Sequence, residues 1–179
     1  MSIATDDSQP RIEKLTSGQP LAQPLWKRIA EFDCGVEALN QFLHRYASQN
    51  QKKDSAQTWL ALIGERVVGY YTLTVGEVTH SESPEGLSKG LPRYPIPVMI
   101  LARLAVDNRF QGQELRQGLL LDALRRTTNA ADIAGIRAIL VHAKDETAGK
   151  FYGHFGFEPF PASPLTMYKL LKDIRSMMG

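Results

Sequence analysis

A turn containing Gly112 joins an apolar, strand-like run to a helix-like run, and this stretch of the sequence is the best suited to hold a charged group. The run Pro97–Val106 predicts a mostly buried strand, and the pattern over Leu115–Ala131 predicts a helix. The first amides of a helix lack intrahelical acceptors and the helix dipole adds partial positive charge, so such a junction attracts phosphate. Most junctions of this kind bind nothing. The arrangement alone therefore assigns no ligand.

A second candidate for chemistry is the pair Phe151-Tyr152, which lies in a short predicted helix and is followed by Gly156-Phe157. The phenol of a tyrosine has a pKa near 10, stays protonated at neutral pH and can donate a proton to a leaving group. A tyrosine here can also be a packed aromatic residue whose hydroxyl is already hydrogen-bonded. We interpret Tyr152 as a proton donor because its motif does not occur alone.

Together the two motifs resemble those of the GCN5-related N-acetyltransferases (GNAT), with Arg109 and Gly112 at the first positions of the family's cofactor pattern. The resemblance implies a mixed α/β fold with one central sheet, splayed at the cofactor site, and helices on both faces. It also implies acetyl transfer from acetyl-CoA to an amine without a metal, Tyr152 protonating the departing thiolate. The expected cofactor contacts come from the strand end, whose backbone would meet the pantetheine arm, from the turn, whose amides would hold the diphosphate, and from the second motif: Leu104, Ala105, Val106, Arg109, Gln111, Gly112, Gln113, Glu114, Leu115, Arg116 and Phe151.

Further segments narrow the resemblance to acetyltransferase toxins that are paired with ribbon-helix-helix antitoxins of the DUF1778 type. These segments include 32–35, 95–98, 101–107 and 141–143. The resemblance implies acetylation of the α-amino group of aminoacyl-tRNA, which blocks translation, by a homodimer whose antitoxin wraps it and binds operator DNA. An α-amino group titrates near pH 8, so a strong base is dispensable. We therefore interpret His142, on an apolar strand, as a core histidine and not as a base.

Several basic residues are candidates for contacts with tRNA phosphates. Arg93 is the first choice because its loop leads into the strand that would line the acceptor cleft. Each of these residues can also be an ordinary solvated surface charge, whereas each productive phosphate contact would steepen the salt dependence of binding. The expected tRNA contacts are Arg93, Lys89, Arg45, Lys52 and Lys53.

The sequence departs from the family at the centre of the expected cofactor site. Glu114 and Arg116 stand where the family carries glycine. A carboxylate about 4 Å from a phosphate charge is repelled by roughly 4 kcal/mol at an effective dielectric constant of 20. Glutamate and arginine are better helix formers than glycine, so the fold should tolerate both. We expect a folded protein with impaired acetyl-CoA binding, and we interpret the two residues as inactivating substitutions, natural or deliberate.

Length and composition set limits on the class of protein. The chain has 179 residues, 43% of them hydrophobic, and a net charge of +2, which does not indicate a general nucleic-acid binder. The single cysteine, Cys34, cannot form an internal disulfide, and no apolar run is long enough to cross a membrane. The first residues lack the pattern of a signal peptide. We expect a cytoplasmic protein without membrane contact.

The elements that must position the site follow from hydrophobic periodicity and from turn residues. We expect an irregular or partly strand-like lead-in over residues 1–24 and a single domain over residues 25–179. Asp33 is the expected cap of the first helix, in which Phe42 and Tyr46 share an apolar face. The expected elements are a helix at 35–52, a hairpin at 58–75, a loop at 79–95, strands at 97–106, 136–143 and 165–170, and helices at 115–131 and 146–154.

Two other functions stay open at this point. One is acetylation of a protein N-terminus, a polyamine or another small amine, because the motifs do not define the acceptor. The other is a binding module, a GNAT fold that no longer turns over and serves in a complex with its antitoxin. Glu114 and Arg116 favour this last reading.

Overall fold

A computed structural model describes residues 8–15, 25–112 and 114–179 of the chain. Its strands form one mixed sheet in the order β1-β2-β3-β4-β5-β7-β6, which confirms the predicted fold class. β4 and β5 are parallel, whereas β1–β2, β2–β3, β5–β7 and β6–β7 are antiparallel. The strands are β1 (Arg11–Lys14), β2 (Gln57–Ile63), β3 (Arg66–Val78), β4 (Ile96–Val106), β5 (Ala138–His142), β6 (Glu158–Phe160) and β7 (Ser163–Leu170).

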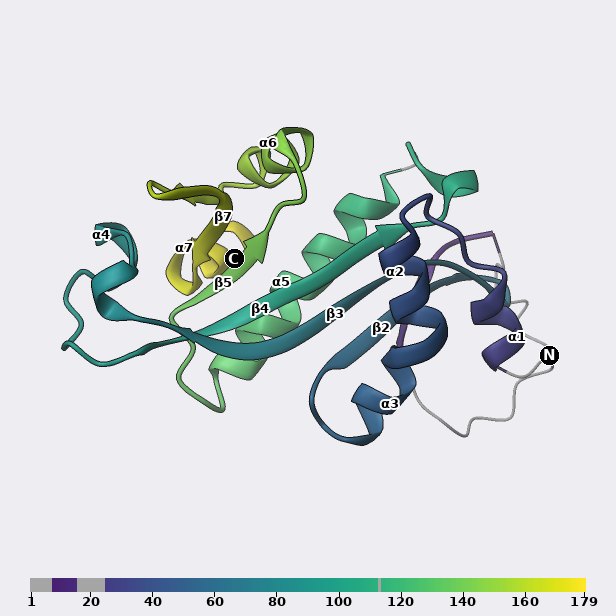
Figure 1. The fold of residues 1–179 in the computed structure, drawn as a ribbon, viewed down its shortest axis with the longest axis horizontal. Coiled ribbons are helices and arrows are strands. Elements are labelled where there is room, and N and C mark those ends of the chain that lie inside the picture. Colours follow the sequence, from purple (N-terminus) through teal and green to yellow (C-terminus); the bar gives the residue numbers. More distant parts are fainter. Residues whose placement is uncertain (1–7, 16–24, 113) are drawn as a thin grey trace. The chain divides into compact units, whose positions relative to one another are not determined.

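The helices include two whose bounds agree with the sequence prediction, α5 and α6, and several short ones that it did not predict (Figure 1). α1 and α4 are too short to show a clear hydrophobic period, whereas α7 has an apolar face, with Leu171 and Ile174 buried, that the sequence analysis overlooked. The helices are α1 (Leu25–Ala30), α2 (Glu37–Gln41), the π-helical turn η1 (Phe42–Tyr46), α3 (Ala47–Lys52), α4 (Glu85–Ser88), α5 (Leu115–Ala131), α6 (Glu146–His154) and α7 (Leu171–Met178), with 3-10 turns η2 (His80–Glu82) and η3 (Asn108–Phe110).

The chain divides into two compact units, residues 1–73 with 103–121 and residues 74–102 with 122–179. The expectation of a single domain over residues 25–179 stays a prediction. Most of the lead-in, residues 1–7 and 16–24, lies outside the described residues, and its described part contains the short strand β1. In the ranges that the structure describes, no helix is long and apolar enough to cross a membrane.

The first unit has helices on both faces of β3. A Cβ added at Gly69 would lie 2.9 Å from Cδ1 of Leu119 on α5 and 3.1 Å from the carbonyl oxygen of Ala105, so α5 packs closely over β3 at this glycine. The next residue, Tyr70, points to the opposite face and packs against Phe42 of η1 at 6.2 Å between ring centroids. Successive strand residues face opposite sides of a sheet. α5 and η1 therefore cover the two faces of one strand.

The first helical region contains a π-helical turn that the sequence analysis did not foresee. The amide of Ala47 donates to the carbonyl of Phe42, a spacing of five residues instead of four. The extra residue in this turn shifts the helical register. Ala47 is buried in the core, while Tyr46 is 51% exposed, so the prediction that Tyr46 shares the apolar face with Phe42 is wrong.

The second unit is built around the parallel pair β4–β5 and the antiparallel pair β5–β7. Its core includes Val98, Leu140 and Tyr168. Arg137, just before β5, donates to the carbonyls of Leu87 and Lys89 at 3.1 Å each and so holds the middle of the segment predicted as a loop. That segment forms two short helical turns, η2 and α4, instead of an irregular loop throughout.

Candidate functional site

The end of β4 is where the backbone was expected to face a cofactor. The pairing of β4 with β5 runs from Val98 to Leu101, and β4 itself continues to Val106. Leu104 is half-buried, and Ala105 and Val106 are buried. The pairing with β5 thus ends before these last residues of β4, and the splay of the sheet at the cofactor site stays a prediction.

A buried carboxylate fixes the first part of the connection from β4 to α5. Asp107 is 1% exposed and accepts four hydrogen bonds. The backbone amide of Arg109 donates at 3.0 Å, its Nε at 2.9 Å and its Nη2 at 3.0 Å, and the amide of Asp33 donates at 3.1 Å. Burial opposes the charge, but these hydrogen bonds outweigh it and hold the pKa of Asp107 below its usual value. Arg109, expected at the cofactor, is thus a brace for the strand end, and its cofactor contact stays a prediction.

A second layer of hydrogen bonds surrounds this carboxylate. Asp33 accepts from the amide of Gly35 and from Asn40 Nδ2, and both bonds lower the pKa of Asp33. The prediction that Asp33 caps the first helix is wrong, because the N-cap of α2 is Val36. Gln111 Nε2 donates to the carbonyls of Val106 and Cys34 at 3.1 and 3.3 Å. We call Asp33, Asn40, Asp107, Arg109 and Gln111 the brace.

The brace was missed by the sequence analysis because it joins segments far apart in the chain. Asp33 and Asp107 are separated by 74 positions, and no local pattern predicts that one amide donates to the other carboxylate. The available signal was a weak one. An aspartate directly after a buried strand and two residues before an arginine, as in Asp107 and Arg109, can form a fork, because a carboxylate accepts two guanidinium N–H groups at once.

The second part of the connection has a backbone that suits glycine. Gly112 has φ +80° and Glu114 has φ +61°, whereas Gln113 lies outside the described residues. The left-handed region costs a residue with a Cβ roughly 1–2 kcal/mol. Asp54 is the other non-glycine residue with positive φ in the described ranges. Glu114 thus occupies a position whose conformation glycine would adopt without strain, in keeping with the family pattern.

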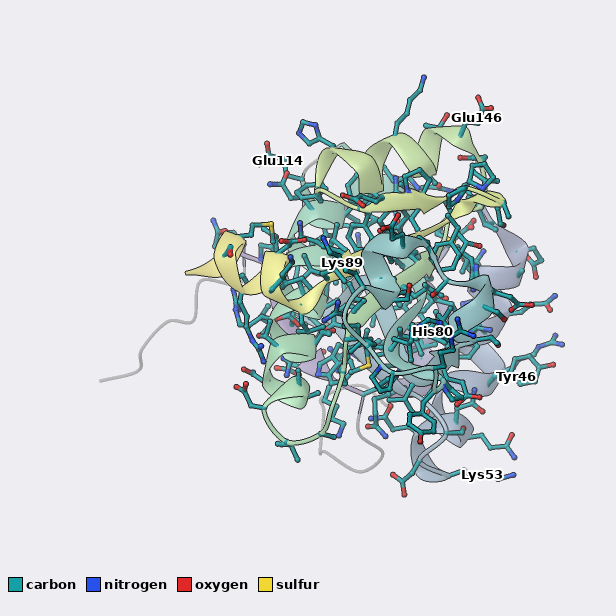
Figure 2. The ribbon with its side chains drawn as sticks, turned by 90° about the vertical axis from the view of Figure 1, so that its left-hand side faces the viewer. Tyr46, Lys53, His80, Lys89, Glu114 and Glu146 are labelled. Atoms are coloured by element: carbon teal, nitrogen blue, oxygen red, sulfur yellow. The ribbon has the colours of Figure 1, made fainter. Side chains whose placement is uncertain are left out.

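Glu114 also sits at the electropositive end of α5. Its carbonyl accepts from the amide of Gly118 at 3.1 Å, so the helical bonds begin here and the next amides lack acceptors within the helix. Glu114 is exposed, and Figure 2 shows its side chain on the outside of the protein. Leu115 is buried and Arg116 is half-buried.

The backbone and side chains of this turn can be compared with what a bound diphosphate group requires. An added Cβ at Gly112 would meet no atom within 4 Å, so the backbone there is open to a ligand's approach. The glycine-like backbone and the first amides of α5 fit a diphosphate. The carboxylate of Glu114 opposes it by charge, although its exposed position lets it turn toward water. The backbone fits the cofactor, and one side chain weakens the fit.

The aromatic motif lies on α6 in the second unit. Asp145 caps this helix by accepting from the amide of Ala148 at 2.8 Å, which fixes where the helix begins. Tyr152 is 5% exposed, and its ring packs edge-on against Phe151 at 5.2 Å and Phe157 at 5.5 Å. The ring is thus held rigidly by its aromatic neighbours. This packing orients the phenol but does not by itself assign it a reaction.

His142 is not the core histidine that we expected. It is the last residue of β5 and its side chain is exposed. Its Nδ1 lies 3.1 Å from Oγ1 of Thr166, the residue opposite it on β7. The strand loses its cover at this end, so the last side chain reaches water.

The basic residues expected to contact tRNA are all exposed. Arg45, Lys52 and Lys53 belong to η1 and α3 and to the residue that follows, in the first unit; Figure 2 labels Lys53. Lys89 follows α4 and Arg93 precedes β4, both in the second unit. Because they are exposed, these side chains are accessible to a nucleic acid. Their contact with tRNA phosphates stays a prediction.

A comparison with known families assigns the chain to one of them. Residues 27–166 match the family described as an acetyltransferase (GNAT) domain. The chain belongs to the GNAT acetyltransferase family. The match runs from α1 to β7 and so includes the brace, the turn before α5 and the aromatic motif of α6. Within the described ranges, no group of three or more His, Cys, Asp or Glu side chains is placed to hold a metal ion.

Curated relatives and solved structures of this GNAT family extend over most of the chain. A tRNA-acetylating toxin of Mycobacterium tuberculosis is 40% identical over 151 residues, 84% of this chain and 90% of the relative. A probable toxin TacT of Sinorhizobium fredii is 28% identical, with 84% and 88% covered. AtaT complexed with acetyl-methionyl-tRNAfMet has a TM-score of 0.82 at 29% identity, covering 96% of this chain and all of AtaT.

Proposed function

We propose that this GNAT acetyltransferase transfers the acetyl group of acetyl-CoA to the α-amino group of an aminoacyl-tRNA and thereby acts as a toxin of translation. The observation that carries the proposal is the 40% identity, over 84% of the chain, with a protein named as a tRNA-acetylating toxin. The similarity to AtaT, whose structure contains acetyl-methionyl-tRNAfMet, supports the same acceptor. The glycine-type turn before α5 supports the same donor.

Acetyl-CoA supplies an acyl group that is activated as a thioester. The amides at the start of α5 and the turn at Gly112 hold its diphosphate, and the end of β4 offers backbone groups to its pantetheine arm. The acceptor amine attacks the acetyl carbon, the carbon–sulfur bond breaks, and the amine loses a proton to water. Oη of Tyr152 gives its proton to the leaving sulfur and regains one from solvent. The rigid packing of the Tyr152 ring keeps that donor in one orientation.

The proposed toxin needs a partner that restrains it. Structures of an AtaT mutant bound to the C-terminus of the antitoxin AtaR and of the AtaT–AtaR complex with DNA are similar to this chain, with TM-scores of 0.77 and 0.74. They support an antitoxin partner and a complex with DNA. We infer that the antitoxin is of the ribbon-helix-helix type and that it makes the contact with operator DNA. We also infer a homodimer, located in the cytoplasm where charged tRNA is found.

A second candidate function has one observation in its favour. The carboxylate of Glu114, in a backbone conformation suited to glycine, stands where the diphosphate would bind. A chain with this defect that still folds would keep its antitoxin-binding surface and lose its turnover. It would then be a binding module with a GNAT fold and no enzymatic activity.

Incubation of the purified chain with labelled acetyl-CoA and a mixture of charged tRNAs tests the main proposal. We expect label in the tRNA fraction, and we expect its release as an N-acetylamino acid on alkaline hydrolysis. Uncharged tRNA, an N-terminal peptide and a polyamine are the matched controls. Label on the peptide or the polyamine alone would assign the enzyme to the other acceptor class.

The Tyr152→Phe variant tests the assignment of the proton donor. Loss of a general acid is expected to lower the rate of transfer by about 100- to 10,000-fold. Acetyl-CoA binding by the variant should match that of the parent chain. Tyr94→Phe, at an exposed tyrosine of the same unit, is the control. If both variants turn over like the parent chain, Tyr152 is a packing residue only.

A further inference from the structure

Arg103 carries a positive charge whose placement the acetyl transfer described above does not use. Its guanidinium carbon lies 3.6 Å from the ring centroid of Phe42, so the cation stacks on the aromatic face. Among the residues that the structure describes, no hydrogen bond or ion pair involves this guanidinium. The phenol of Tyr70, whose ring stacks with that of Phe42, donates its hydrogen bond to the carbonyl of Leu39 at 2.7 Å. Arg103 is half-buried, so part of its charge faces solvent.

The aromatic partner of Arg103 belongs to the π-helical turn. Phe42 begins η1 and is fixed from below by Tyr70, 6.2 Å away in a stacked arrangement. This fixed ring holds the guanidinium plane without consuming its N–H donors. A guanidinium has five donors in a fork that matches phosphate oxygens. The arrangement therefore presents an oriented cation that can bind an anion without first breaking an ion pair.

The same turn exposes an aromatic ring. Tyr46 lies four residues after Phe42, about one helical turn along, and it is 51% exposed because the extra residue of η1 moves it out of the core. Figure 2 shows Tyr46 at the outer edge of the helical segment. π-helical turns cost stability and occur frequently at functional sites. The turn η1 thus carries an exposed aromatic ring, Tyr46, and a second ring, Phe42, on which an arginine stacks. Proteins bind unpaired nucleotides by stacking bases on aromatic rings and by holding phosphates with arginine.

We propose that Arg103 binds a backbone phosphate of the single-stranded 3′ end of aminoacyl-tRNA and that Tyr46 stacks on a base of the same single strand. This inference rests on the proposed function and names the residues that hold the acceptor substrate. It fits the position of Arg103 on β4, next to Leu104, at the strand end from which the acetyl group would be delivered. It also gives the π-helical turn a role in placing one aromatic ring outside the core and another beneath the arginine.

Binding of one uncharged tRNA to the full chain tests the proposal directly. The tRNA is used with its complete 3′ end and with the last nucleotides of that end removed. We expect Arg103→Gln to weaken binding of the complete tRNA about tenfold and to lower the slope of log affinity against log salt by about 0.7, the value for one phosphate of a single strand. We expect Tyr46→Ala to weaken binding about tenfold with little change in slope. The parent chain should bind the complete tRNA more tightly than the shortened one. This difference in affinity should be smaller in both variants.

Three controls keep the result interpretable. Arg66→Gln removes an exposed arginine at the start of β3 in the same unit and should leave binding unchanged. Arg103→Met keeps an apolar side chain against Phe42, so it serves if Arg103→Gln lowers the urea midpoint of unfolding. Acetyl-CoA affinity should stay at the level of the parent chain in every variant. A loss of acetyl-CoA affinity in Arg103→Gln would make Arg103 a ligand of the cofactor and overturn the proposal.

The remaining outcomes separate this inference from the proposed function. If the parent chain binds tRNA, and Arg103→Gln and Arg103→Met bind it equally well with the same salt slope, the inference on Arg103 is wrong and the proposed function stands. If Tyr46→Ala alone binds equally well, the stacking role of Tyr46 is wrong. If the parent chain neither binds tRNA nor acetylates charged tRNA, the proposed function and this inference are wrong together.

Discussion

The two parts of the connection between β4 and α5 are held in place by opposite means. The brace around Asp107 is a set of hydrogen bonds between side chains and backbone, and its central carboxylate is 1% exposed. The following positions, Gly112 and Glu114, rely on a left-handed backbone, and an added Cβ at Gly112 would meet no atom within 4 Å. A cofactor turn needs both parts. A fixed base determines where the turn begins, and an uncovered backbone leaves its amides accessible.

The comparison also separates two kinds of sequence constraint. In the brace each residue is required for its functional groups, because Asp107 and Arg109 satisfy each other and the nearby amides. At Gly112 the requirement is for the absence of a side chain. A substitution in the brace should therefore act on folding, and a substitution at the left-handed positions should act on ligand binding and on local strain.

The largest effect is expected from Asp107→Ala, which removes all four hydrogen bonds of the carboxylate. We expect a loss of about 3 kcal/mol in the free energy of unfolding, since buried donors are left without acceptors. Urea denaturation measures it. Asp132→Ala, which breaks the exposed ion pair with Arg175, should cost less than about 1 kcal/mol. Similar losses for both variants would mean that the brace adds nothing beyond a surface ion pair.

The next largest effect is expected from Glu114→Gly on cofactor binding. Removal of one like charge beside the diphosphate should raise the affinity for acetyl-CoA about thirtyfold, which corresponds to roughly 2 kcal/mol. Titration calorimetry measures the affinity. Glu114→Gln keeps a side chain at the same backbone position, so it isolates the contribution of the charge and should show most of the gain. Equal affinities for the three proteins would remove electrostatic repulsion as the reason for weak binding.

Acid should weaken the brace by a smaller amount than deletion, because protonation leaves the side chain in place. The folded pKa values of Asp107 and Asp33 are lowered, so the stability they provide is complete above the unfolded pKa of about 3.9 and is lost as the pH falls through the lower folded values. Urea denaturation between pH 6 and pH 2 measures this loss. Asp107→Asn should start less stable and change less with pH. A parallel pH dependence of both proteins would assign the acid sensitivity to other groups.

The smallest effect is expected from Gly112→Ala. With φ +80° and no neighbouring atom, alanine suffers backbone strain alone, and we expect a loss of about 1 kcal/mol in unfolding free energy. Gly118→Ala is the matched control, since Gly118 lies inside α5 with equally open surroundings and no positive φ. There alanine should stabilise by up to about 1 kcal/mol. Losses of equal size at both glycines would contradict the strain argument.

Local patterns were sufficient for the long helices of the molecule. The bounds of α5 and α6 agree with the sequence prediction. Five apolar residues of α5, spaced at helical intervals, are buried on one face. Gly156, with φ +83°, follows α6 closely. The turn around Gly112 was also predictable, because glycine marks left-handed positions.

Other features could not be predicted, for physical reasons that differ. Over so few residues the π-helical turn η1 has the same apolar spacing as an α-helix. A single hydrogen bond that spans five residues instead of four shifts the register and moves Tyr46 out of the core. The brace depends on tertiary contacts between distant segments. His142 appeared buried because its strand is apolar, but cover at the end of a strand depends on neighbouring elements. The roles of Tyr152 and of the cofactor residues stay predictions from the resemblance.

The single cysteine of the sequence is hydrogen-bonded to two residues of the brace, so its thiol can report when this part of the protein opens. Cys34 is 7% exposed, its amide donates to Asn40 and its carbonyl accepts from Gln111. A thiol reagent can modify it only when this segment opens. The rate of labelling in native buffer therefore measures how frequently the segment opens. Because the sequence contains no second thiol, that rate needs no correction for modification elsewhere.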